Sequence, residues 1–112
     1  MRNVRGIYLP AGDSHIAEHL ERGPLYKDKG TYQLAKIEAC MSACQAAGRI
    51  GMALDIGAHV GTWSRVLADA FERVEAFEPM PHLVECFEKN TDGLANVRLH
   101  EHGLSDVSKW MP

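Results

Sequence analysis

Residues 55–61, Asp-Ile-Gly-Ala-His-Val-Gly, join an apolar run at residues 50–56 to a helical pattern at residues 62–71. We expect position 57 to require its glycine, because a Cβ atom would clash in the tight turn there. Glycine at 61 lets the helix start close to the strand or to a ligand. The N–H groups at the start of that helix would face a polar ligand. An apolar strand, this loop and a helix predict one unit of a parallel α/β sheet.

The elements around this loop alternate in type along the chain. The hydrophobic pattern predicts helices at residues 14–22, 31–47, 62–71 and 81–90, and strands at residues 50–56, 73–77 and 96–101. This order predicts a three-layer α/β sandwich of parallel strands with right-handed crossovers, in which the strand at residues 50–56 lies centrally. Residues 1–13 look irregular, and residues 25–30 look like a polar loop. We therefore expect a helical leader over residues 1–49 and part of a Rossmann-like, doubly wound sheet over residues 50–112.

The chemistry of the loop favours a nucleoside ligand. Glu78 ends the second strand twenty-three residues after Asp55, where an acidic side chain can accept the hydroxyl groups of a ribose. Asp55 lies two residues before the first glycine, and its charge disfavours a pyrophosphate. The same charge suits the positively charged amino-acid end of S-adenosylmethionine. A dinucleotide fingerprint would also need a third glycine, which this loop lacks.

Three segments resemble the class I S-adenosylmethionine-dependent methyltransferases, and among them the FkbM family. They are the loop and helix start at residues 55–64, Ala-Phe-Glu-Pro at residues 76–79, and Gly-Leu-Ser-Asp at residues 103–106. The resemblance implies contacts with the cofactor S-adenosylmethionine from Asp55, Gly57, Ala58, His59, Gly61, Glu78, Pro79, Ser105 and Asp106. It places the loop at the methionine end of the cofactor and Glu78 at the ribose. Pro79 and Met80 would flank the adenine, with residues 104–106 near its edge.

The sequence departs from the pattern of that family in three places. His59 stands where the family usually has Asn, and Gly103 stands where Ala is common. The family continues into a fourth strand with an Asp-x-Glu-Gly segment, which no residue after Asp106 supplies. We therefore expect an incomplete domain, in the form of a fragment or a truncated product. The open edge of the strand at residues 50–56 would then meet a second copy or a complementing partner.

Composition narrows the classes of partner. The net charge of −3 is too mild to favour nucleic acid, and no apolar run approaches the length of a membrane span. Three cysteines without paired spacing indicate a reducing, cytoplasmic environment. The segment His100-Glu101-His102 lacks a third ligand nearby, so we expect no metal. Tyr8, His15 and Tyr26 of the leader are candidates to cover the mouth of the site.

The resemblance implies methyl transfer, by in-line attack of an acceptor on the sulfonium methyl group, to a hydroxyl of a small molecule or sugar. Such a reaction depends mainly on positioning, so a general-base motif is not required. Two other functions remain open from the residues. One is a non-catalytic module that binds S-adenosylmethionine or another nucleoside. The other is an NAD-dependent oxidoreductase, against which the charge of Asp55 argues.

Overall fold

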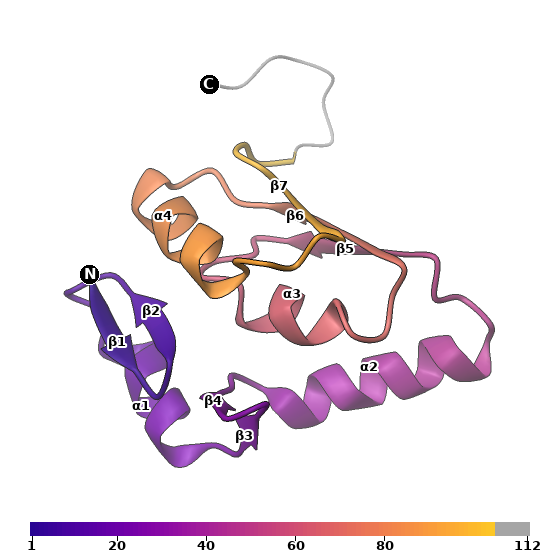
Figure 1. The fold of residues 1–112 in the computed structure, drawn as a ribbon, viewed down its shortest axis with the longest axis horizontal. Helices are drawn as coiled ribbons and strands as arrows, with labels where there is room; N and C mark the ends of the chain where they lie inside the picture. The colour runs from indigo at the N-terminus through magenta and orange to yellow at the C-terminus, as the bar shows by residue number, and fades with distance from the viewer. Residues whose placement is uncertain (105–112) are drawn as a thin grey trace.

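A parallel sheet forms the centre of the computed structural model, which describes residues 1–104 (Figure 1). Its strands are β5 (Met52–Ile56), β6 (Arg73–Phe77) and β7 (Val97–His100), in the order β5-β6-β7. Both pairings are parallel, with Asp55 opposite Ala76 and Ala76 opposite Leu99. Helices connect the strands, so the predicted class, a partial Rossmann-like sheet with flanking helices, is confirmed.

One face of the sheet carries the helices. These are α2 (Leu34–Ala46), α3 (Thr62–Leu67) and α4 (Pro81–Asn90). Their buried apolar residues pack on sheet residues that share one face, Ala53, Val74 and Ala76. Figure 1 shows α3 between the sheet and α2, which crosses beneath it. Helices α2, α3 and α4 therefore lie on the same side of the sheet.

The opposite face of the sheet is open among residues 1–104. Met52, Leu54 and Ile56 point to that face and are 47%, 55% and 62% exposed. In this part of the chain β5 pairs with β6 alone, so it is an edge strand and not the expected central one. The three-layer arrangement that its two apolar faces indicate is not formed by the described residues.

Two short hairpins and a helix make up most of the N-terminal segment. They are β1 (Arg2–Val4) with β2 (Ile7–Leu9), α1 (His15–Arg22), and β3 (Leu25–Tyr26) with β4 (Lys29–Gly30). Sequence analysis expected irregular structure and a loop in place of the hairpins. Each hairpin turns through two residues with positive φ, Arg5-Gly6 and Lys27-Asp28. Such turns match the twist of paired strands, but only one residue of each pair, Gly6 and Asp28, is of a type that favours a positive φ.

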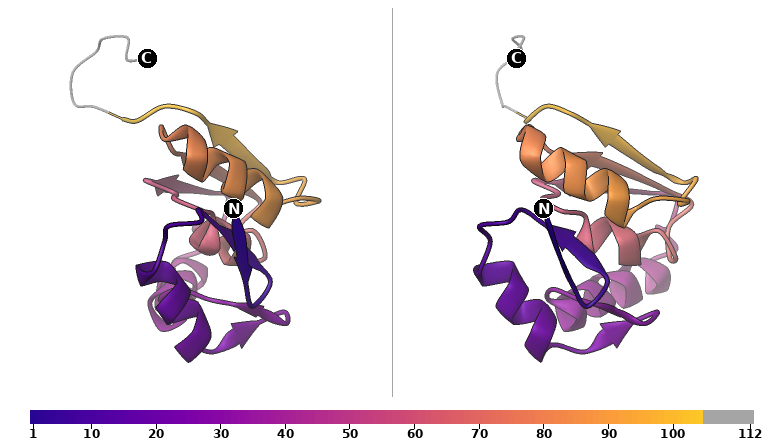
Figure 2. Two further views of the ribbon diagram at one scale, coloured as in Figure 1. Left: turned by 90° about the vertical axis from the view of Figure 1, so that its left-hand side faces the viewer. Right: turned by 60° about the vertical axis from the view of Figure 1, so that its left-hand side comes forward.

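A buried asparagine joins the first hairpin to α4. The Asn90 side chain accepts a hydrogen bond from the backbone N–H of Tyr8 at 2.7 Å and donates to the carbonyl oxygens of Tyr8 and Val60 at 2.9 and 2.7 Å. The same hairpin shares a hydrophobic cluster with Leu83 and Cys86 of α4. Figure 2 shows the hairpin beneath α4. The N-terminal segment is thus joined to α4 by a shared hydrophobic cluster and by the hydrogen bonds of Asn90.

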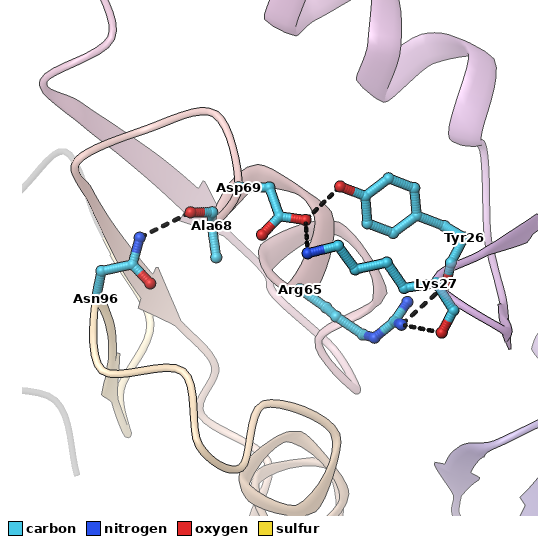
Figure 3. A network of polar contacts seen from close by, with 6 residues as sticks. All are labelled: Tyr26, Lys27, Arg65, Ala68, Asp69 and Asn96. Atoms are coloured by element: carbon cyan, nitrogen blue, oxygen red, sulfur yellow. Dashed lines mark hydrogen bonds and ion pairs between the residues drawn. The ribbon is translucent and has the colours of Figure 1, made fainter.

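A polar network joins the second hairpin to α3 (Figure 3). Asp69 accepts a hydrogen bond from the Tyr26 hydroxyl. Its Oδ2 also forms an ion pair with Lys27 Nζ at 2.8 Å. Arg65 Nη2 donates to the backbone oxygen of Tyr26 at 2.9 Å. Burial, followed by the bond to Asp69, raises the pKa of Tyr26 to about 12. The phenol therefore stays a hydrogen-bond donor throughout the neutral range.

Helix α3 ends earlier than the apolar pattern predicts, at Leu67 and not at residue 71. Asn96 Nδ2 donates to the carbonyl oxygens of Ala68 and Phe71 at 2.8 and 3.1 Å. These contacts satisfy carbonyl groups beyond the helix end, so the chain turns there and enters β6. No helix in residues 1–104 has the length and apolar character to cross a membrane.

Candidate functional site

The loop after β5 turns through a glycine with a positive φ. Gly57 has φ +72°, and a Cβ atom placed on it would meet no other atom within 4 Å. The expected clash is therefore wrong, and glycine is favoured there by backbone conformation alone. The N–H groups of Gly57 and Ala58 both donate to Phe77 O at 2.9 Å. The loop is thus held against the carboxyl end of β6.

Glu78 stabilises this loop from the end of β6. Its side chain is buried, at 5% exposure. Oε1 accepts the backbone N–H of His59 at 2.8 Å, and Oε2 accepts the N–H of Met80 at 3.1 Å. A carboxylate has room for about four hydrogen bonds, so each oxygen retains an acceptor position. The structure therefore gives Glu78 a role in shaping the loop, which the sequence did not indicate.

His59 occupies a left-handed backbone position, with φ +54°. Asn, Asp and His are enriched among the non-glycine residues that adopt such a conformation. This explains how a histidine can occupy position 59. Among the described residues its Nδ1 is buried and has no hydrogen-bond partner.

Gly61 allows a close contact between the loop and α4. It has φ +90°, and a Cβ atom there would lie 2.9 Å from Phe87 Cδ2 and 3.3 Å from Thr91 Cγ2. Sequence analysis expected the strand or a ligand to be the close neighbour. The close neighbour is the side chain of Phe87, so Gly61 positions the loop by packing.

Asp55 lies half-buried where β5 meets α3. Its Oδ2 accepts a hydrogen bond from the Ser64 hydroxyl at 2.6 Å. Burial raises the pKa of Asp55, hydrogen bonding from Ser64 opposes this, and the nearby Glu78 adds to the rise. Sequence analysis missed Ser64, whose fully buried hydroxyl fixes the orientation of this carboxylate.

Replacing Asp55 by Asn is expected to stabilise the fold at neutral pH. The folded-state pKa of Asp55 lies above its ordinary value. The stabilisation that this shift gives the folded state is therefore present below about pH 3.9. It is lost as the pH rises through the folded-state pKa. We expect the Asp55→Asn variant to melt at a higher temperature than the wild type at pH 7, because the neutral amide avoids the cost of burying a charge.

Thermal melts of both proteins at pH 7 and pH 3.5 measure this effect. The difference should become smaller at the lower pH, because protonation of Asp55 is favoured there. Asp92→Asn, at an exposed position, is the matched control and should melt like the wild type. A lower Tm of Asp55→Asn at pH 7 would contradict the prediction.

A groove of about 1020 Å³ runs along β5 and the loop that follows it. Four of the predicted site residues line it: Asp55, Gly57, Ala58 and His59. The far wall comes from α2 and from the N-terminal segment, including His15 and Tyr32. Of the three leader residues considered as a cover, His15 lines the groove, whereas Tyr8 and Tyr26 line other hollows. Gly61, Glu78 and Pro79 are not among the residues that line it.

Glu78 and Pro79 directly follow β6 and lie near the chain that leaves β7. The N–H of Glu78 donates to His100 O at 3.1 Å, and a Cβ atom on Gly103 would lie 3.9 Å from Pro79 Cγ. Met80 and Leu104 are both exposed. Ser105 and Asp106 lie outside the described residues. Glu78 therefore stands between the groove and the chain that leaves β7.

Comparisons with known proteins support the fold. No protein-family model matches the chain, and no curated protein matches it. Among solved structures, it is similar to a SAM-dependent methyltransferase from Agrobacterium tumefaciens, with 21% identity and a TM-score of 0.54 over 71% of this chain. The chain spans 28% of the length of that protein. It is also similar to DhpI, solved in complex with SAH, with 23% identity and a TM-score of 0.44 over 62% of this chain and 35% of that one.

Proposed function

We propose that this chain forms the S-adenosylmethionine-binding part of a methyltransferase. The observation that carries the proposal is the contact between Glu78 and the loop after β5. The carboxylate of Glu78 accepts the N–H of His59 at 2.8 Å, so an acidic residue and a glycine-containing loop meet at the carboxyl ends of two adjacent parallel strands. Ligands of open α/β sheets bind at this end of the strands.

The proposed cofactor matches the charges and the shape of the site. The carboxylate of Asp55 would face its ammonium group, in the groove of about 1020 Å³ that Asp55 lines. The free acceptor positions of Glu78 would take the ribose hydroxyls, once the loop opens enough to admit them. Pro79, Met80, Leu104 and the adjoining Ser105 and Asp106 would contact the adenine. The fold shared with the Agrobacterium enzyme supports this assignment.

Two finer assignments belong to the same proposal. The order of the three motifs favours the FkbM family, and the acceptor would be a hydroxyl group of a small molecule or sugar. The cofactor would supply an electrophilic methyl group, while residues of the chain bind and orient it. A non-catalytic module that keeps the cofactor site is the alternative, and it differs in showing binding without turnover.

Calorimetric titration with S-adenosylhomocysteine tests the proposal, with NAD as the competing ligand. We expect S-adenosylhomocysteine to bind and NAD not to displace it. The Glu78→Gln variant should bind at least tenfold more weakly, because hydrogen bonds to a charged group contribute about 1.5–3 kcal/mol each.

Glu75→Gln is the matched control. Glu75 lies on β6, the strand that Glu78 directly follows, and its side chain points to the face of the sheet opposite to Val74 and Ala76. That variant should bind S-adenosylhomocysteine like the wild type. Tighter binding of NAD, or equal affinity in the Glu78→Gln variant, would overturn the proposal. An assay of methyl transfer to a hydroxyl acceptor would then distinguish an enzyme from a non-catalytic module.

A further inference from the structure

Two histidines lie one turn apart on α1, at the rim of the groove. His15 is the first residue of the helix and His19 follows four positions later. Their ring centroids are 4.8 Å apart, with an interplanar angle of 76°. Both side chains are exposed, and His15 lines the groove. The proposed cofactor site uses neither of them.

Tyr32 packs against both imidazoles. Its ring centroid lies 5.0 Å from that of His19 and 6.1 Å from that of His15, edge to face in each case. Tyr32 itself is half-buried against the cluster that includes Ile16 and Leu20. A ring anchored in the core therefore restricts the rotamers of the two histidines and keeps them together.

Spacing and distance both match chelation of one metal ion. Histidines at positions i and i+4 of a helix lie on one face, where they can share a metal. With metal–nitrogen bonds of about 2.1 Å, two imidazoles on adjacent positions of one ion have ring centroids about 5 Å apart. The observed 4.8 Å agrees with that separation. Neutral imidazole is a preferred ligand of Zn²⁺, Ni²⁺ and Cu²⁺.

We infer that His15 and His19 form a two-histidine site for a divalent transition-metal ion at the rim of the groove. Among residues 1–104, no group of three or more His, Cys, Asp or Glu side chains is placed to bind a metal. The described part of the chain therefore supplies two ligands, fewer than the three or four protein ligands that zinc sites usually have. Water or an oxygen atom of a ligand in the groove would complete the coordination. The site should favour ions in the Irving–Williams order and should exclude Mg²⁺, which prefers oxygen.

A second pair of histidines provides the comparison. The rings of His100 and His102 are 5.9 Å apart. His100 stacks on Phe77 at 4.6 Å, and its Nε2 lies 3.7 Å from Glu75 Oε2. His100 is partly buried among these neighbours, whereas His15 and His19 are both exposed. We therefore assign the site to α1.

Calorimetric titration of the 112-residue chain with Ni²⁺ tests this inference. The protein should be made without a histidine tag. We expect one equivalent of Ni²⁺ to bind, and His15→Gln and His19→Gln each to weaken binding at least tenfold. His82→Gln, on α4, should change the affinity less than twofold. Mg²⁺ at the same concentration should not compete.

Nuclear magnetic resonance locates the ion independently of the variants. Paramagnetic Ni²⁺ should broaden the signals of residues 15–19 and Tyr32 first. Broadening centred on His100 and His102, or unchanged affinity in His15→Gln, would overturn the assignment. Because both histidines of α1 are exposed, the variants should keep the wild-type circular dichroism spectrum, and binding of S-adenosylhomocysteine remains a separate measurement.

Discussion

The Asn90→Leu variant is expected to lose about 4 kcal/mol of its free energy of unfolding, since each buried polar group left without a partner costs about 1–3 kcal/mol. Asn90 is buried, and all three of its hydrogen bonds go to backbone groups, two on Tyr8 and one on Val60. Leucine has a similar volume but satisfies none of them. A domain of this kind has about 5–15 kcal/mol of stability in total, so the loss approaches unfolding.

Urea denaturation of the variant and the wild type measures the difference. Thr91→Val, at the next position, is the control: it removes the hydrogen bond from Thr91 Oγ1 to Phe87 O, and it should cost about 1 kcal/mol. Hydrogen exchange should show the largest loss of protection in the hairpin of β1 and β2. A loss below 1 kcal/mol for Asn90→Leu would show that water replaces the side chain.

Strand β6 and helix α4 could be predicted closely because their signals are local. The strand predicted at residues 73–77 and the helix predicted at residues 81–90 have the observed bounds. In both cases the apolar spacing matches one kind of element, and a proline or glutamate–proline pair marks the boundary. Local pattern and tertiary packing agree there, so the sequence was sufficient.

The hairpins of the N-terminal segment could not be predicted in the same way. Their strands have two or three residues, too few for a periodic pattern. The first is fixed by contacts with Asn90, 82 positions away from Tyr8. The second is fixed by Asp69, 43 positions away from Tyr26. Tertiary contacts at such separations leave no trace in a short window of sequence.

The candidate site likewise contains residues that local sequence indicates and residues that only tertiary packing brings together. The loop at residues 55–61 and Glu78 were identified because strand ends and glycines are visible in the sequence. Ser64 escaped notice because its partner, Asp55, lies on another element. His15 entered the sequence analysis as one of three leader residues without a distinguishing signal. Its place on the groove depends on how the leader packs, which the sequence did not reveal.

The Gly61→Ala variant is expected to lose about 3 kcal/mol of its free energy of unfolding, from about 1–2 kcal/mol for the left-handed backbone and about 1–3 kcal/mol for overpacking. Gly61 has φ +90°, and the new Cβ atom would lie 2.9 Å from Phe87 Cδ2. Phe87 is itself 1% exposed, so its ring has little room to move. Because Gly61 ends the loop that carries His59, the displacement should also weaken binding of S-adenosylhomocysteine.

Gly93→Ala separates the two causes of this loss. Gly93 has φ +81°, but no atom lies within 4 Å of a Cβ placed there. That variant should therefore lose about 1–2 kcal/mol, from conformation alone. In a Phe87→Leu background the additional cost of Gly61→Ala should shrink, because the smaller side chain leaves space for the methyl group. Equal losses for Gly61→Ala and Gly93→Ala would show that packing against Phe87 does not select glycine at position 61.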